Sequence, residues 1–200
     1  MINGVNMSST DNKILKLTVR EFFSVNHYLA YRGIYSGGRC MAVCYKTTSA
    51  KTFQKEFAEY VKNEVEKQGW IKPDDRYRQI ILDATYYFPK TNMDSNNHWK
   101  VTLDAITDSG VVWIDDKIVC ERCNRIYYDS EDPRIEYEVR VAEHIGIFDN
   151  EEQLRSFEEH CRSCSRYRDG VCSIFKKASE GRIQDCIVDL ECQKYKARKK

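Results

Sequence analysis

Residues 92–116, NMDSNNHWKVTLDAITDSGVVWIDD, predict an amphipathic helix with acidic residues at both ends. Three apolar residues recur at the spacing of one helical face: Trp99, Leu103 and Ile106. Three polar residues recur on the opposite face: Asn97, Lys100 and Asp104. Asp94 stands where an N-cap belongs, and Gly110 ends the helix before an extended segment. One face should therefore pack in a core while the other presents polar groups.

The segments before this helix predict a strand, a loop and a second helix. Residues 14–23 alternate as a strand does. The glycines and serines after it indicate an irregular loop, which carries three basic residues: Arg32, Arg39 and Lys46. Apolar residues then recur every four positions between Ser49, a candidate cap, and Gly69, a candidate end.

The remaining strands complete a mixed order of elements. Residues 78–88 alternate as a strand that Pro89 ends, and two more strands are expected over residues 118–128 and 135–141, joined as a hairpin. This order predicts an α+β fold, a mixed α/β sandwich-like domain that ends near residue 148.

A short helix with Asn150 and Gln153 in capping-box positions marks the boundary to a cysteine-rich segment, residues 149–200, which ends in the basic tail KYKARKK. Five of the nine cysteines lie there, in a segment that looks too short to have its own core: Cys161, Cys164, Cys172, Cys186 and Cys192. Four of these five could bind a structural Zn²⁺ in a small zinc-ribbon-like appendage: Cys161, Cys164 and Cys172 with either Cys186 or Cys192. Cys192 is favoured because ECQKY resembles the last cysteine and aromatic residue of small zinc ribbons. An iron–sulfur cluster is the alternative.

Composition limits the class of protein. The 200 residues carry a net charge of +1, contain no apolar run long enough to span a membrane, and begin without a secretory signal. Cysteines without such a signal favour free thiols or metal ligands over disulfides. We expect a cytoplasmic, intracellular protein with a disordered N-terminus at residues 1–12, no membrane partner and no small-molecule cofactor.

The acidic groups at the two ends of the 92–116 stretch suggest a metal site. Carboxylates from a helix start and a strand end can converge, and Mg²⁺ takes such oxygen ligands together with water. The candidates are Asp94, Asp115 and Asp116. Lys100 could then neutralise charge that develops on a phosphoryl oxygen. Taken singly, each of these residues can also be read as a cap, a turn or a solvated side chain.

Over residues 14–145 the chain resembles the RusA family of Holliday-junction resolvases, which are crossover junction endodeoxyribonucleases. The resemblance lies in SVNHYL, in MDSNNHWKVTLDAITDSGVVWIDDKI and in IEYEVRV. It implies a RusA-like nuclease domain over residues 13–148, a homodimer, and a Mg²⁺-dependent endonuclease that resolves branched DNA by paired nicks in recombination or repair. Such genes often lie in prophages.

Carried over by position, the resemblance makes Asp94 and Asp116 metal ligands, Asp115 a neighbouring ligand or orienting group, and Lys100 the cation that stabilises the transition state. Asn97 would order the helix start. The basic loop would contact DNA phosphates through Arg32, Arg39 and Lys46.

One position departs from the family pattern, because Asn96 replaces an acidic residue. An amide oxygen can bind a hard cation but lacks charge, so Mg²⁺ affinity should fall. Two alternatives therefore stay open: an inactive or weakly active protein that binds branched DNA, and a zinc-dependent interaction protein.

Overall fold

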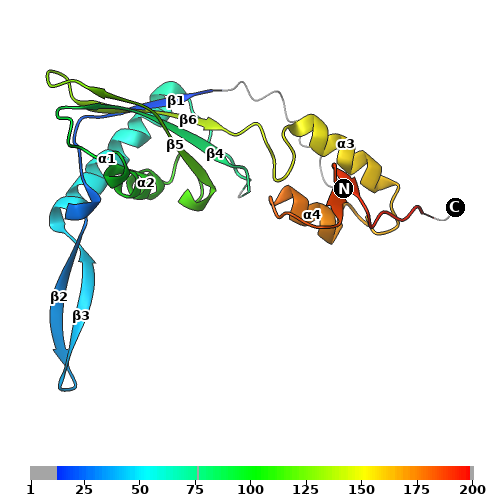
Figure 1. The fold of residues 1–200 in the computed structure, drawn as a ribbon, viewed down its shortest axis with the longest axis horizontal. Helices are drawn as coiled ribbons and strands as arrows, with labels where there is room; N and C mark the ends of the chain where they lie inside the picture. The colour runs from blue at the N-terminus through cyan, green and yellow to red at the C-terminus, as the bar shows by residue number, and fades with distance from the viewer. Residues whose placement is uncertain (1–12, 76, 199–200) are drawn as a thin grey trace. The chain divides into compact units, whose positions relative to one another are not determined.

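The computed structural model describes residues 13–75 and 77–198, which fall into two compact units. The first unit is formed by the chain up to Asp74 and by Ile80–Arg140, and the second by Asp75–Gln79 and Val141–Lys200. The first unit contains a sheet and two α-helices, and the second contains two shorter α-helices (Figure 1). The predicted α+β fold is confirmed.

The first unit is built on a four-stranded sheet in the order β1-β6-β4-β5. Its strands are β1 (Leu15–Val19), β6 (Arg134–Val141), β4 (Ile80–Phe88) and β5 (Val119–Tyr128). β1 is antiparallel to β6, whereas β4 and β5 run parallel. The expected hairpin between β5 and β6 is wrong, since β4 lies between them. The helix between β4 and β5 makes these two strands parallel neighbours, as in other strand-helix-strand units.

Two helices, α1 (Thr48–Gln68) and α2 (Asn96–Ser109), pack against each other and lie on the same side of the sheet in Figure 1. The predicted apolar face of β4 is confirmed, because its alternating residues are fully buried: Ile80, Leu82, Ala84, Tyr86 and Phe88. Within α2, Leu103 and Ile106 are buried, and Trp99 is half-buried against Tyr86. α1 begins slightly earlier than expected, with Thr47 as its cap, and ends at Gly69 in the left-handed conformation.

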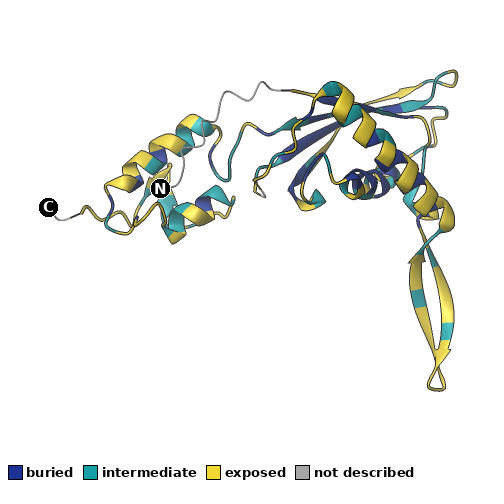
Figure 2. Cartoon of the chain, turned by 180° about the vertical axis from the view of Figure 1, so that it is seen from behind, coloured by how far each residue is buried: buried dark blue, intermediate teal, exposed yellow. Residues whose placement is uncertain are grey.

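The segment expected to be an irregular loop is a regular hairpin. A short 3-10 turn, η1 (Val25–His27), leads into β2 (Leu29–Ser36), which pairs with β3 (Arg39–Lys46). Gly37 and Gly38 form its turn with positive φ angles. Most of the hairpin is exposed (Figure 2). Because neither face is buried, its apolar and polar residues do not alternate in the way that would predict strands.

The second unit contains α3 (Glu151–Arg162), α4 (Ser173–Ser179) and the two-residue strands β7 (Ile187–Val188) and β8 (Glu191–Cys192). The capping role of Asn150 is confirmed, since its side chain accepts a hydrogen bond from the Gln153 amide at 3.0 Å. Contrary to expectation, this unit has a small core of its own: Phe148, Phe157, Cys161, Cys164, Tyr167 and Ala178. Three of these six residues are aromatic, which gives much apolar contact to a short chain.

The second unit depends on a close approach of backbone at Gly146. Its φ is 61°, and a Cβ placed there would lie 2.1 Å from the carbonyl oxygen of Ala178. The backbone amide of the next residue, Ile147, donates to the same oxygen at 3.0 Å. Only glycine allows this contact between the start of the unit and α4.

Gly146→Ala should therefore destabilise the second unit by about 2–4 kcal/mol, because it adds a clash to the strain of a positive φ. Gly170→Ala is the matched control: its φ is 77°, but nothing lies within 4 Å of the added atom. This control should cost only about 1–2 kcal/mol. Hydrogen exchange of the α4 amides measures both losses, and equal losses would contradict the account.

Candidate active site

The start of α2 is ordered by Asp94. Its Oδ1 accepts a hydrogen bond from the Asn96 amide at 2.9 Å, and its carbonyl accepts one from the Asn97 amide at 3.2 Å. Ser95 is the N-cap residue, but its side chain makes no capping hydrogen bond. The carboxylate of the preceding residue, Asp94, binds a free amide of the first helical turn instead. The Tyr86 hydroxyl donates to the Ser95 carbonyl at 3.4 Å and ties this turn to β4.

The centre of the polar cluster is Asp104, on the face of α2 that the sequence predicted to be polar. Lys100 Nζ donates to its Oδ1 at 2.6 Å, one helical turn earlier. The Tyr28 hydroxyl, just after η1, donates to its Oδ2. Only 15% of the Asp104 side chain is exposed, so this carboxylate is largely removed from water and stabilised by specific partners.

The pKa values in the cluster follow from these contacts. Burial alone would raise the pKa of Asp104, but hydrogen bonds from Lys100 and Tyr28 hold it below its ordinary value. Burial and the same carboxylate raise the pKa of Tyr28. The hydrogen bond to Asp104 raises the pKa of Lys100. At neutral pH the cluster therefore contains a carboxylate, an ammonium group and a neutral phenol.

Lys46, which the sequence predicted to contact DNA together with Arg32 and Arg39, also belongs to this cluster. Its Nζ lies 3.6 Å from Asp104 Oδ2 and donates to Gln54 Oε1 at 3.1 Å. Gln54, a buried residue of α1, donates through Nε2 to the Tyr28 hydroxyl at 3.1 Å. Lys46 stands at the base of the hairpin, and its side chain turns toward α1 and α2, whereas Arg32 and Arg39 lie further along the exposed strands.

The second acidic group lies in the 3-10 turn η2 (Asp116–Ile118), between α2 and β5. Asp116 Oδ2 is 3.8 Å from Lys100 Nζ. Lys100 therefore contacts two carboxylates, those of Asp104 and Asp116. Asp115 is bound elsewhere, because its carboxylate accepts from the Lys117 amide at 3.1 Å and from Lys117 Nζ at 2.8 Å. Of the predicted residues, the structure thus brings Lys100 and Asp116 together.

Among the residues that the structure describes, no group of three or more acidic, histidine or cysteine side chains could hold a metal ion as placed. Mg²⁺ needs fewer protein ligands, because it keeps several waters and takes one or two carboxylates together with substrate phosphates. The carboxylates of Asp94 and Asp116 suit it in donor chemistry, and both side chains are accessible to solvent. The residues present are therefore compatible with Mg²⁺.

A comparison with protein families matches residues 32–140 to the model of the family Endodeoxyribonuclease RusA. The chain belongs to the RusA family. The matched region runs from within β2 to Arg140 in β6 and includes Lys46, Gln54, Lys100, Asp104 and Asp116. Membership makes the chain a nuclease, and the family implies the resolution of Holliday junctions. A search of the curated proteins finds no match.

Sequence reasoning assigned no role to three residues of the cluster: Tyr28, Gln54 and Asp104. Two of them carried a local signal. Gln54 is a polar residue next to the apolar series of α1, and Asp104 shares a helical face with Lys100. Tyr28 lies 76 positions before Asp104, and only the folded chain brings them together.

The structure separates the cysteines of the second unit into those that line a cavity and one that does not. Four of the five predicted ligands line one cavity: Cys161, Cys164, Cys172 and Cys192. Burial raises the pKa of the Cys161 thiol to about 12, and the nearby thiols of Cys172, Cys192 and Cys164 add to this rise. Cys186, the residue disfavoured from the sequence, is not among the cavity's lining residues, and its carbonyl accepts from the Gln193 amide at 2.8 Å.

The depressed pKa of Asp104 predicts how stability depends on pH. Its contribution is complete above the unfolded pKa of about 3.9 and is lost as the pH falls through the lower folded value. Urea unfolding of the first unit between pH 7 and pH 2 should therefore show a steeper acid loss in the natural chain than in Asp104→Asn. Lys100→Met should shrink this acid loss, since it removes the strongest cause of the depression and brings the folded pKa closer to the unfolded one. Identical pH curves for all three proteins would contradict this assignment.

Proposed function

We propose that the first unit is a Mg²⁺-dependent endonuclease that resolves Holliday junctions or related branched DNA by paired nicks. The observation that carries this proposal is the contact of Lys100 with Asp104 and Asp116, inside the region that matches the RusA family. Paired nicks require two active sites, so we also propose that the chain acts as a homodimer.

Asp94 and Asp116 would hold the Mg²⁺ ion. When bound, the ion would neutralise phosphate charge and promote attack by water. Lys100 would donate a hydrogen bond to the phosphoryl oxygen on which negative charge develops. Its ammonium group carries several N–H donors, so it can stay bound to Asp104 while another donor faces the substrate.

The other residues of the cluster would position Lys100. Asp104 fixes its ammonium group, while Tyr28 and Lys46 fix Asp104 from the segment around the hairpin. Asp115, bound by Lys117, fits the orienting role better than that of a ligand. Asn97 donates through its backbone to Asp94, and this bond would help to hold that carboxylate at the helix start.

Asn96 supports a second candidate function, a protein that binds branched DNA without cutting it. The backbone amide of Asn96 donates to the Asp94 carboxylate, and the Asn96 side chain is exposed. Because this side chain is a neutral amide, it lowers the negative charge available to a divalent cation. Cleavage and binding assays on the same junction separate the two functions.

The sequence predicted a nuclease domain over residues 13–148 and a cysteine-rich lobe over residues 149–200; we further propose that the boundary between them lies near Val141, because Phe148 packs in the small core of the second unit. The small core of the second unit supports a lobe that folds around its own residues. The cytoplasmic location, the prophage origin and the zinc content of this lobe stay predictions. Among the described residues, no helix is long and apolar enough to cross a membrane.

Incubation of the full chain with a synthetic four-way junction should yield paired nicks with Mg²⁺ and none with a chelator. Asp116→Asn and Lys100→Met should each lower the nicking rate by about 10²–10³-fold, because each removes a charge at the reacting phosphate. Glu59→Gln is the control: it makes a comparable charge change on an exposed residue of α1. Nicking by Asp116→Asn at the natural rate would contradict the proposal, and binding without nicking by the natural chain would favour the second candidate.

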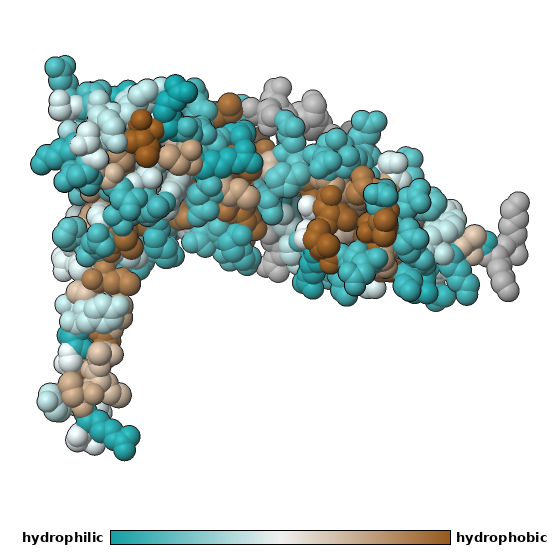
Figure 3. Space-filling model, viewed as in Figure 1, coloured by the Kyte–Doolittle hydropathy of each residue, from teal (hydrophilic) through white to brown (hydrophobic). Residues whose placement is uncertain are grey.

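The exposed hairpin would contact DNA phosphates. Figure 3 shows pale and brown colours along most of it, against the teal of much of the surface. Arg32 lies over the Tyr45 ring, with 5.5 Å between its guanidinium carbon and the ring centre. Arg39 pairs with Ser36 next to the turn.

Arg32→Ala and Arg39→Ala should each weaken junction binding and reduce the slope of log affinity against log salt by about 1, since each removes one phosphate contact. Fluorescence anisotropy at several salt concentrations measures the slope. Lys62→Ala, which removes a charge that pairs with Glu59 on α1, should leave it unchanged. Unchanged slopes in both arginine variants would place the DNA contacts elsewhere.

A further inference from the structure

Basic residues gather on two segments of the second unit. Residues 161–168, CRSCSRYR, and residues 194–198, KYKAR, contain six arginines and lysines and no acidic residue. The six are Arg162, Arg166, Arg168, Lys194, Lys196 and Arg198. Because the whole chain carries 32 basic and 31 acidic residues, its net charge of +1 hides this local excess of positive charge.

The fold places these two segments side by side. Cys164 and Ala197 form an antiparallel bridge between them. The backbone amide of Ser165 donates to the Lys196 carbonyl at 2.7 Å. The Arg198 side chain donates through Nε to the Cys164 carbonyl at 3.2 Å, which ties the second segment to the turn after α3. Charges that are far apart in the sequence therefore lie together on one surface.

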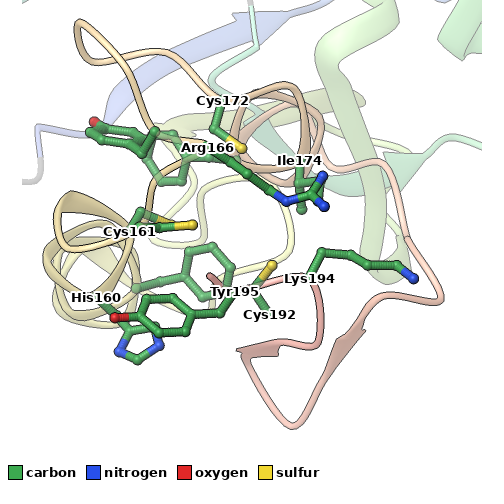
Figure 4. Close-up of a pocket in the computed structure, with 12 residues that line it drawn as sticks. His160, Cys161, Arg166, Cys172, Ile174, Cys192, Lys194 and Tyr195 are labelled. Atoms are coloured by element: carbon green, nitrogen blue, oxygen red, sulfur yellow. The ribbon is translucent and has the colours of Figure 1, made fainter. Parts of the chain in front are cut away.

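Most of this positive charge is not neutralised. All six basic residues are exposed. Arg162 pairs with Glu158 at 3.7 Å, but within residues 13–75 and 77–198 no acidic residue forms an ion pair with Arg166, Lys194 or Lys196. Figure 4 shows the side chains of Arg166 and Lys194 extending in the same direction from the wall of one cavity. Like charges held close together repel each other, and an anionic partner relieves this repulsion.

The exposure of these side chains favours a polymer of phosphates over a single small anion. An exposed pair of opposite charges contributes little in water. Each phosphate contact with a nucleic acid also releases counterions, so several weak contacts add up in one binding event. Membership of the RusA family makes the chain a nuclease that acts on DNA, which identifies the polymer.

We propose that Arg166, Lys194 and Lys196, here called the basic patch, bind the phosphate backbone of a duplex arm of the branched DNA. Such contacts carry no sequence information, which suits an arm of any sequence. The basic patch lies in the second unit, outside the nuclease site. Because both units belong to one chain, DNA bound by one of them is held at a higher effective concentration near the other. The choice of DNA rests on the proposed function, but binding to the basic patch requires no cleavage.

The test measures binding of the full chain to an unbranched DNA duplex, with a chelator in place of Mg²⁺. Replacing all three basic-patch residues by alanine should weaken binding at least tenfold and reduce the slope of log affinity against log salt by about 3, since three phosphate contacts are lost. Arg198 stays in place because its side chain holds the two segments together. A variant that keeps the charges, with Arg166→Lys, Lys194→Arg and Lys196→Arg, should bind as the natural chain does. An equal loss in this variant would contradict a role for charge.

The matched control removes three positive charges elsewhere in the second unit, by alanine substitution of Lys176, Lys177 and Arg182. Lys176 and Arg182 pair with Glu180 at 4.0 and 3.0 Å, so this control should keep nearly the natural slope. Equal losses in the two alanine variants would overturn the proposal, because net charge alone would then explain the binding. Unchanged binding in the basic-patch variant would also overturn it, as would a natural chain that binds phosphatidylglycerol vesicles but not the duplex.

The outcome for the basic patch is separate from the outcome for the nuclease site. A natural chain that binds the duplex through the basic patch but never nicks a four-way junction would support this inference and contradict the proposed function. A chain that nicks the junction, but whose binding to the duplex does not depend on the basic patch, would do the reverse.

Discussion

The candidate active site depends on one largely buried carboxylate, that of Asp104. A charge removed from water must be paired, and here the partners come from three parts of the chain: Tyr28 after η1, Lys46 at the end of β3, and Lys100 on the same helix. This requirement fixes the position of the hairpin base relative to α2. It also fixes the ammonium group of Lys100, the residue that we propose acts on the phosphate.

The β4-α2-β5 crossover brings one of the two acidic segments, that of Asp116, to this group. Asp94 lies where the chain enters α2, and Asp116 lies where it leaves for β5, with Lys100 in contact with Asp116. Because α2 buries one face in the unit's core, its other face is free to hold charged side chains. The family match covers α1, α2 and the strands β4, β5 and β6, but not β1.

The sequence predicted the local features of the chain and missed most long-range pairings. The amphipathic pattern located α2 and Gly110 as its end, because these signals lie within a few turns of chain. Neither the position of β4 between β5 and β6 nor the contact of Tyr28 with Asp104 has a local signature. The exposed hairpin was missed since neither of its faces is buried in a core.

The central claim is that Asp94 and Asp116 share one divalent cation beside Lys100. Mn²⁺ substitutes for Mg²⁺ at oxygen ligand sites and is detected directly by electron paramagnetic resonance. Titration of the full chain in the absence of DNA should show about one bound Mn²⁺ per chain, and the affinity should fall at least tenfold in both Asp94→Asn and Asp116→Asn. Equal Mn²⁺ affinity in the natural chain and in both variants would contradict the claim.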